Sequence, residues 1–492
     1  MSHLPRVVIA FALVSSCLTA VASSAPVPTP TIEGPVTGGL GMPFIAATTF
    51  DPSAVGYVQE EYFISGTATA FTNTGPLGSD GTWTVTPGDT APYKTRIVVY
   101  RPASRPRFDG TVVVEWLNVS GGLDAAPDWI AAHTAMIHEG MAWVGVSAQS
   151  VGVEGGSGLL GLPPRPLKTV DPARYGSLSH PGDSFSYDIF SQAGQALRHP
   201  SGPDPLGGLP PKVLIADGES QSAFRMVTYI DAVHPVAGIY DGFLVHSRGA
   251  GGLLGAPLSE LPEPAIGIPS PTLIRPDLDV PVLTLQSETD LLLLQSLAAR
   301  QADTARLRLW EIAGTAHADA YTLVAGATDL GKSPDAADLV LTSSPLGAFT
   351  CGQFINSGPQ HFVVKSAIHW LDRWVRRGTP PPSAPRLVID PGPPAHLVLD
   401  AHGNATGGIR TPELDVPIAT LSGGGQSGSL ACLLFGTTVP FDAVTLHALY
   451  PTHRAYVSAF NRATLRALRA GFVLTPDAKL MRAAALRSDV GR

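Results

Sequence analysis

Charged residues are scarce in this chain of 492 residues. Only 15% are Asp, Glu, Lys or Arg, the formal net charge is −8 at pH 7, and no run of basic residues is longer than the pair Arg376 and Arg377. Nucleic acids and anionic membrane surfaces are bound through clustered positive charge. The composition therefore argues against both as partners.

Cysteine is rarer still, with only Cys17, Cys351 and Cys432. So few cysteines exclude a disulfide-rich scaffold, and none of them are paired at the spacing of zinc ligands. The metalloprotease motif His-Glu-x-x-His is absent as well. We expect no metal and no other cofactor.

Long apolar segments are missing, so no transmembrane helix is expected. Shorter apolar segments are plentiful, because 44% of the residues are hydrophobic, and 52 glycines and 46 prolines lie among them. This is enough apolar material for one large, loop-rich domain. The composition does not indicate an oligomeric state.

The first residues have the form of an export signal. Arg6 precedes the apolar run Val7–Val14, and Ala20–Ala22 is a small-x-small site for signal peptidase. We predict a signal peptide over residues 1–22, cleaved after Ala22, and a secreted or periplasmic protein.

A lipoprotein signal is the alternative. The sequence Val-Ser-Ser-Cys over Val14–Cys17 resembles a lipoprotein cleavage site, which would leave Cys17 lipidated. The apolar stretch Leu18–Ala22 is unusual after such a site, so cleavage after Ala22 is favoured.

The most informative segment contains Ser220. Residues Val213–Ala216 have the pattern of a short apolar strand, Gly218-Glu219-Ser220-Gln221-Ser222 forms a turn, and a helical pattern follows. A serine at so sharp a strand-to-helix turn projects its hydroxyl out of the sheet, and the residues two places before and after it must be small. Gly218 and Ser222 are small, so we predict a nucleophile elbow at Ser220.

Two other serines have similar neighbours. Ser427 lies in Gly425–Ser429, but no strand precedes this glycine-rich run, which indicates a flexible loop. Ser147 follows a strand, but Gln149 is too large for the second flanking position. Only Ser220 combines strand, turn and helix. A surface serine in an ordinary loop is the alternative on this motif alone.

Two later strands end near residues that can activate a serine. The strand Pro281–Leu285 leads into a turn with Glu288 and Asp290, and Arg306–Ile312 is followed by His317. Positions just past the carboxyl ends of parallel strands converge on one site. The order serine, acid, histidine is also that of triads on this kind of sheet.

These residue types suit nucleophilic catalysis. An imidazole with a pKa of about 6.5 can remove the serine proton during attack, which makes His317 the candidate base. A carboxylate would hold the imidazole in the required tautomer and stabilise its charged form. Asp290 is the favoured acid because it lies at the end of its turn, and Glu288 is the alternative.

The oxyanion that forms during attack needs hydrogen-bond donors. The backbone amide of Gln221, directly after the elbow, is one candidate. A second amide normally comes from the loop after the third strand, and Thr111–Glu115 is followed by the glycine-containing loop Asn118–Gly122. We predict that Val119 supplies it.

Segments around these residues resemble those of secreted bacterial proteins known only as alpha/beta hydrolase domain proteins. The resemblance is carried by VVVEWLNVSGGLDAAPDW (Val112–Trp129), RYGSLSHPGDSFSYDIFSQAG (Arg174–Gly194), GESQSA (Gly218–Ala223) and FGTTVPFDAVTLHALYPTH (Phe435–His453). It covers nearly the whole mature chain. It implies an α/β-hydrolase fold with Ser220, His317 and one of the two acids as a triad, and the family has no settled substrate.

The order of elements also predicts an α/β fold. Strands are expected over Val58–Phe71, Thr95–Tyr100, Thr111–Trp116, Trp143–Ala148, Val213–Ala216, Phe243–His246, Val282–Leu285 and Leu307–Ile312. Helices are expected over Trp129–Glu139, Tyr187–Leu197, Ser222–Val233, Asp290–Arg300 and Phe362–Val375. Such alternation predicts a mostly parallel central sheet with helices on both faces.

Other stretches add to this hydrolase core, which we assign to residues 38–385. A leader rich in Pro and Ala covers residues 23–37. Long insertions at residues 250–276 and 321–360 follow strands whose ends face the site, so we expect them to form a lid or cap. Residues 386–492 are expected to be a C-terminal extension packed on the core.

Removal of the signal peptide leaves two cysteines, Cys351 and Cys432. An even pair in an oxidising compartment predicts a disulfide between them. Two buried free thiols are the alternative.

Together these features predict an exported serine hydrolase that cleaves a carboxylic ester of a small-molecule or oligomeric substrate through an acyl-enzyme. One alternative is the same fold acting on an amide, lactone or thioester. The other is a non-catalytic binding protein on a hydrolase scaffold, which the presence of all three triad residue types disfavours.

Overall fold

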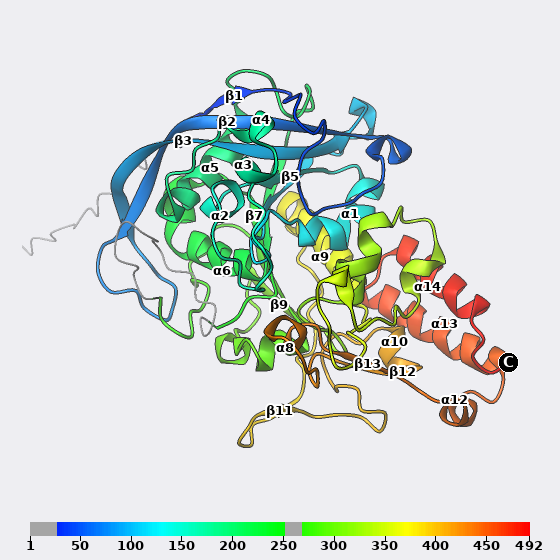
Figure 1. Ribbon diagram of the computed structural model, residues 1–492. Helices are drawn as coiled ribbons and strands as arrows, with labels where there is room; N and C mark the ends of the chain where they lie inside the picture. Colours follow the sequence, from blue (N-terminus) through cyan, green and yellow to red (C-terminus); the bar gives the residue numbers. More distant parts are fainter. Residues whose placement is uncertain (1–26, 251–267) are drawn as a thin grey trace, which may run out of the picture.

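The computed structural model describes residues 27–250 and 268–492 (Figure 1). Its centre is a nine-stranded sheet with the order β1-β2-β3-β5-β4-β6-β7-β8-β9. The strands of this sheet are β1 (Thr31–Glu33), β2 (Tyr57–Asn73), β3 (Val85–Pro102), β4 (Thr111–Trp116), β5 (Ala142–Val146), β6 (Val213–Glu219), β7 (Gly242–His246), β8 (Val282–Gln286) and β9 (Leu307–Glu311). Every strand expected from the sequence is present.

The sheet is mostly parallel, as expected. Strands β5, β4, β6, β7, β8 and β9 pair in parallel, while β1, β2 and β3 form an antiparallel edge. All residues of β4 and β6 are buried. Parallel strands covered on both faces have nearly continuous apolar sequences. Strand β6, which leads to Ser220, lies between β4 and β7.

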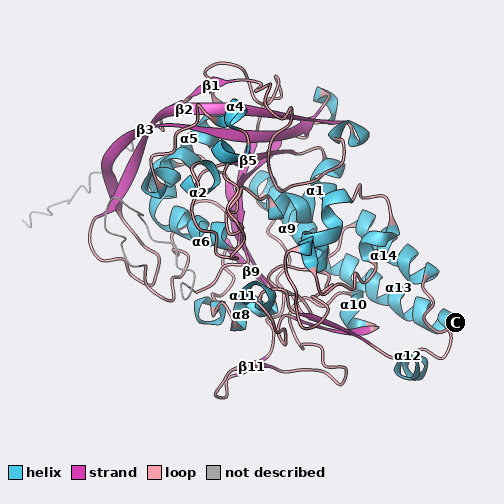
Figure 2. Cartoon of the chain, viewed as in Figure 1, coloured by secondary structure: helices cyan, strands magenta, loops and turns pink. Residues whose placement is uncertain are grey.

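Helices cover both faces of the sheet (Figure 2). The main covering helices are α5 (Ser186–Arg198) and α6 (Gln221–Thr228) on one face, and α1 (Pro127–Glu139) and α9 (Gln360–Arg377) on the other. Successive side chains of a strand point to opposite faces. Accordingly, Val112 and Val114 of β4 pack on the side of α5 and α6, and Val113 packs on the side of α1 and α9.

The remaining helices are shorter or lie in the C-terminal region. They are α2 (Ser150–Val153), α3 (Leu167–Val170), α4 (Pro172–Tyr175), α7 (His234–Ala237), α8 (Glu288–Leu292), α10 (Pro412–Asp415), α11 (Leu430–Leu433), α12 (Ala443–Leu449), α13 (His453–Ala470) and α14 (Thr475–Arg487).

The helix expected over Asp290–Arg300 is interrupted. Helix α8 ends at Leu292, a 3-10 helix covers Ser296–Ala299, and Gln295 between them has a φ of 60°. A residue in the left-handed region cannot continue a right-handed helix. The apolar spacing alone therefore predicted too long a helix.

The sheet begins earlier than expected. Strand β1 lies within residues 23–37, the predicted leader, and Ile32 pairs with Ile64 of β2. Ile32 is buried in the core on the α5 face. The proline-rich composition concealed this short edge strand. The predicted signal peptide, with Cys17 and Ala22, lies outside the described residues.

The two predicted insertions differ in how far the structure describes them. Most of the first, residues 251–267, lies outside the described residues. The second, residues 321–360, consists of loops and short helical turns. Asn356 anchors it, because its Nδ2 donates hydrogen bonds to the backbone oxygens of Gly314 and Ser422, each at 3.1 Å.

A disulfide joins Cys351 to Cys432, as the sequence predicted. It connects the second insertion to helix α11 in the C-terminal region.

The C-terminal region contains two small hairpins, β10 (Ile389–Asp390) with β11 (His396–Leu397) and β12 (Ala419–Ser422) with β13 (Thr437–Pro440). It packs on the hydrolase core: Phe362 of α9 shares an apolar cluster with Phe460 of α13 and Met481 of α14. No helix within residues 27–250 and 268–492 is both long and apolar enough to cross a membrane.

Candidate active site

Ser220 lies at the sharp turn between β6 and α6. Its φ of 59° and ψ of −122° form a conformation that residues other than glycine rarely adopt. The Ser220 amide donates to the backbone oxygen of His246 at 3.0 Å, and the Ser220 carbonyl accepts from the Ala223 amide at 2.9 Å. Strand β7 and the first turn of α6 therefore hold the strained serine at the carboxyl end of the sheet.

The residues that flank the elbow approach each other closely. A Cβ atom at Gly218 would lie 3.0 Å from the carbonyl carbon and oxygen of Ser222. This is closer than a Cβ normally comes to a neighbouring backbone. The contact explains why the turn needs a residue without a side chain at position 218.

His317 lies between Ser220 and Asp290. Its Nε2 is 2.6 Å from Ser220 Oγ, and its Nδ1 is 2.6 Å from Asp290 Oδ1. Both distances are in the range of strong hydrogen bonds, and all three side chains are buried. The structure thus brings together three residues that the sequence spreads over 97 positions.

Asp290 is oriented by the first turn of α8. Its Oδ2 accepts from the Ser287 amide at 2.7 Å, while its own amide donates to Ser287 Oγ at 3.3 Å. This reciprocal pair is a capping box. It occupies one carboxylate oxygen of Asp290 and leaves Oδ1 for His317.

Glu288, the alternative acid, has other partners. Its two carboxylate oxygens accept hydrogen bonds from the backbone amides of Gly314 at 2.5 Å and Gly423 at 2.8 Å. Burial raises the pKa of Glu288 to about 7, although these hydrogen bonds lower it. Glu288 connects the C-terminal region to the loop before His317, and Asp290 is the carboxylate that reaches the imidazole.

The environment of His317 favours its charged form. Burial acts against the imidazolium, but the charge and hydrogen bond of Asp290, together with the charge of Glu219, outweigh it and raise the pKa of His317 above its usual value. An imidazole in this position can accept a proton from Ser220 and hold it.

The loop after β4 is bonded to the elbow. Asn118 Nδ2 donates to the backbone oxygen of Glu219 at 3.1 Å. Val119 follows in this loop and is buried. Gln221 is the first residue of α6, so its amide has no acceptor within the helix. The two predicted oxyanion donors therefore belong to segments that are bonded together beside Ser220.

Sequence reasoning missed three ionisable residues of the site. Glu219 Oε1 lies 3.6 Å from His317 Nε2, and His246 Nδ1 lies 2.6 Å from Asp128 Oδ1. All three are buried. Two signals were present in the sequence, because Glu219 directly precedes Ser220 and His246 ends the strand that follows the elbow helix.

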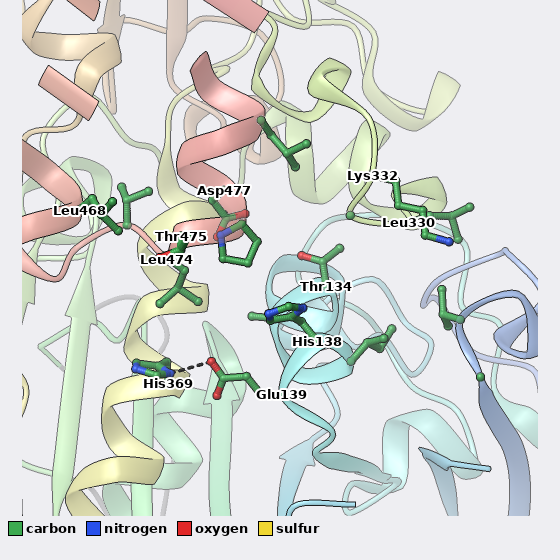
Figure 3. Close-up of a pocket in the computed structure, with 18 of the residues that line it drawn as sticks. Thr134, His138, Glu139, Leu330, Lys332, His369, Leu468, Leu474, Thr475 and Asp477 are labelled. Atoms are coloured by element: carbon green, nitrogen blue, oxygen red, sulfur yellow. Dashed lines mark hydrogen bonds and ion pairs between the residues drawn. The ribbon is translucent and has the colours of Figure 1, made fainter. Parts of the chain in front are cut away.

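The cavity described here lies apart from Ser220 and His317. A cavity of about 790 Å³ lies between the end of α1, α9 and the start of α14 (Figure 3). Its lining includes Glu139 and His369, which are 2.6 Å apart, but neither Ser220 nor His317. Within residues 27–250 and 268–492, no group of three or more His, Cys, Asp or Glu residues is placed to hold a metal ion.

Several solved structures are distantly similar to the chain, and no curated protein sequence matches it. An arylesterase is 12% identical over 46% of this chain and 69% of its own, with a TM-score of 0.25. An alpha-beta serine hydrolase homologue from Coxiella burnetii is 11% identical over 46% and 84%, with a TM-score of 0.28. A carboxylesterase from Lactobacillus plantarum WCFS1 is 9% identical over 47% and 76%, with a TM-score of 0.25.

The family comparison covers much more of the chain. The model of the alpha/beta hydrolase domain family matches residues 32–483. This range includes the whole central sheet from Ile32 onward and the three residues that meet at the elbow. The protein belongs to the alpha/beta hydrolase domain family.

Proposed function

We propose that this protein is a serine hydrolase that cleaves carboxylic esters through an acyl-enzyme. One observation carries the proposal: two 2.6 Å contacts run from Ser220 Oγ to His317 Nε2 and from His317 Nδ1 to Asp290 Oδ1. A serine hydroxyl is a weak nucleophile until an adjacent base takes its proton. An imidazole oriented by a buried carboxylate is such a base.

In the acylation half-reaction, His317 Nε2 takes the Ser220 proton while Oγ attacks the ester carbonyl carbon. The amides of Gln221 and Val119 stabilise the oxyanion, and Asp290 stabilises the imidazolium. The tetrahedral intermediate then collapses. The alcohol leaves with the proton from His317, and the acyl group remains on Ser220.

In the deacylation half-reaction, a water molecule attacks the acyl carbon. His317 removes a proton from this water and returns it to Ser220 as the carboxylic acid leaves. The catalytic residues are thereby restored, and the scheme needs no metal or other cofactor.

The same residues could act on other acyl compounds. An alcohol or thiol leaves a tetrahedral intermediate more readily than an amine, which is why we propose an ester. Hydrolysis rates for an ester, a thioester, a lactone and an amide with matched acyl groups distinguish these substrates.

We also propose that the chain is exported and processed after Ala22. The disulfide between Cys351 and Cys432 supports this, because such bonds persist mainly in oxidising compartments. The intact mass of exported protein tests the proposal. A mature chain that starts at Ser23 agrees with it, and a chain that starts at a lipidated Cys17 supports the lipoprotein alternative.

Hydrolysis of a short p-nitrophenyl ester tests the proposed reaction. Ser220→Ala and His317→Ala should each lower kcat by roughly 10⁴- to 10⁶-fold. Ser427→Ala is the matched control, since Ser427 has the same Gly-x-Ser-x-Ser setting but lies exposed in a loop, and it should keep full activity. A folded wild-type protein that hydrolyses none of the four acyl classes would instead favour a non-catalytic binding protein.

A further inference from the structure

Glu219 places a second carboxylate beside His317. Its Oε1 lies 3.6 Å from His317 Nε2, the nitrogen that contacts Ser220 Oγ. Asp290 contacts the other ring nitrogen. His317 therefore has a carboxylate near each nitrogen, and the reaction described above uses only one of them.

The Glu219 side chain is held in place by Asn118. The Asn118 side-chain amide donates to Glu219 Oε2 at 3.2 Å and to the Glu219 backbone oxygen at 3.1 Å. Because one amide group contacts both the side chain and the backbone of Glu219, it restricts the rotation of the carboxylate. Oε2 is occupied in this way, and Oε1 is the oxygen near His317.

A second histidine–carboxylate pair lies on the same side of the sheet. His246 Nδ1 is 2.6 Å from Asp128 Oδ1, at the start of α1, and His246 Nε2 is 2.9 Å from Gln360 Nε2, at the start of α9. Burial acts against the charged form of His246, but Asp128 outweighs it and raises its pKa. Strand pairing sets His246 opposite Glu219 of β6, so this pair belongs to the surroundings of Glu219.

Opposing charges surround Glu219. Burial has the largest effect and raises the pKa of Glu219 to about 7. His317 and His246 lower it, while Asp128 and Asp290 raise it. On β6 and the neighbouring strand β4, burial raises the pKa values of Asp217 and Glu115 well above their usual range, which favours their neutral forms. The two histidines are the groups that favour a charged Glu219.

We propose that Glu219 is a second electrostatic partner of His317, whose carboxylate stabilises the imidazolium while the acyl-enzyme forms and breaks down. This inference rests on the proposed serine hydrolase function. The imidazole is neutral before attack and charged in the transition state. A carboxylate beside Nε2 therefore stabilises the transition state more than the ground state, which is the condition for faster catalysis.

The proposal has a definite pH signature. The carboxylate of Glu219 raises the pKa of His317, and only the neutral imidazole can accept the Ser220 proton. Glu219→Gln should lower the His317 pKa and move the acid limb of kcat/KM to lower pH, by about one unit for a charge this close. It should also lower the plateau of kcat by roughly tenfold. Glu219→Asp keeps the charge and should recover part of both effects.

The experiment measures the pH profile of kcat/KM and the NMR titration of the His317 imidazole in the wild type and in Glu219→Gln. Glu413→Gln is the matched control, because Glu413 is another carboxyl whose pKa burial raises, to about 6, and it lies in the C-terminal region. The control should leave both measurements unchanged. If Glu219→Gln fails to fold, Glu219→Asp replaces it and should shift the acid limb in the same direction by a smaller amount, because the shorter side chain draws the charge back from His317 Nε2.

The outcomes separate this inference from the proposed function. An active Glu219→Gln variant with an unchanged acid limb and an unchanged His317 titration overturns the role of Glu219 and leaves the serine hydrolase proposal intact. A shifted His317 titration in a protein that hydrolyses no acyl substrate overturns the proposed function, and with it the catalytic use of the pair.

Discussion

Asn118 donates hydrogen bonds from its side-chain amide to two oxygens of Glu219, the backbone oxygen at 3.1 Å and Oε2 at 3.2 Å. These bonds join the loop after β4 to the strand that carries the elbow. They hold the segment that contains the Val119 amide and also orient the Glu219 carboxylate. The proposed oxyanion donor and the proposed second partner of His317 therefore depend on one side chain.

Asn118→Ala should lower kcat by roughly 10- to 100-fold and change KM little, because both groups act mainly in the transition state. Steady-state kinetics on a p-nitrophenyl ester measures this. Asn73→Ala is the control and should behave as wild type, since the side chain of Asn73 donates to the backbone oxygen of Gly75 in a turn remote from Ser220. An unchanged kcat in a folded Asn118→Ala protein would contradict the prediction.

Asp290→Asn and Glu288→Gln should have different effects. Asp290→Asn removes the charge beside His317 Nδ1 and should lower kcat by about 10⁴-fold. Glu288→Gln leaves one buried backbone amide without its acceptor and should cost about 1–3 kcal/mol of stability. Its kcat should stay within a few fold of wild type. Kinetics and urea unfolding of both variants test this, and the reverse order of effects on kcat would make Glu288 the acid.

The pH dependence of the wild-type enzyme follows from His317. A protonated His317 cannot accept the Ser220 proton, so kcat/KM should rise as the pH increases through its pKa. Because Asp290 and Glu219 raise this pKa, the midpoint of the acid limb should lie above the usual value of about 6.5. A pH profile of kcat/KM with a midpoint at or below that value would show that burial dominates instead.

The Cys351–Cys432 bond should stabilise the folded protein. It closes a loop over a sequence separation of 81 residues, for which the chain-entropy model gives roughly 4 kcal/mol. Replacing both cysteines with serine should lower the free energy of unfolding by about this amount. Thiol titration of the unfolded, unreduced mature chain should find no free thiol, and two reactive thiols would rule the bond out.

Much of this architecture could be predicted from residue patterns. The strands of the parallel sheet are buried on both faces, so each forms an apolar run with a visible end. Ser220 directly follows such an end, and the two acids and His317 lie in the loops or turns after two others. Their convergence could be predicted because parallel strands end at the same edge of a sheet.

Other features of the fold and the site depend on contacts between residues that are distant in sequence, and local sequence patterns do not reveal such contacts. Glu288 and Asp290 are two residues apart after the same strand, and only the capping box with Ser287 and the backbone amides of Gly314 and Gly423 distinguish them. His246 lies beside Glu219 because β7 pairs with β6, and Asp128 reaches His246 from the start of α1. Strand β1 was missed because its three residues lie in a proline-rich stretch and are too few to show an alternating pattern.

Labelling with a fluorophosphonate tests the central claim most directly. Only a hydroxyl with an adjacent base and oxyanion donors reacts quickly with such a probe. Peptide mass spectrometry of the labelled protein should find the modification on Ser220 alone, and labelling should be lost in Ser220→Ala and retained in Ser427→Ala. An unlabelled Ser220 in the folded wild-type protein, or a label on another serine, would contradict the assignment of Ser220 as the nucleophile.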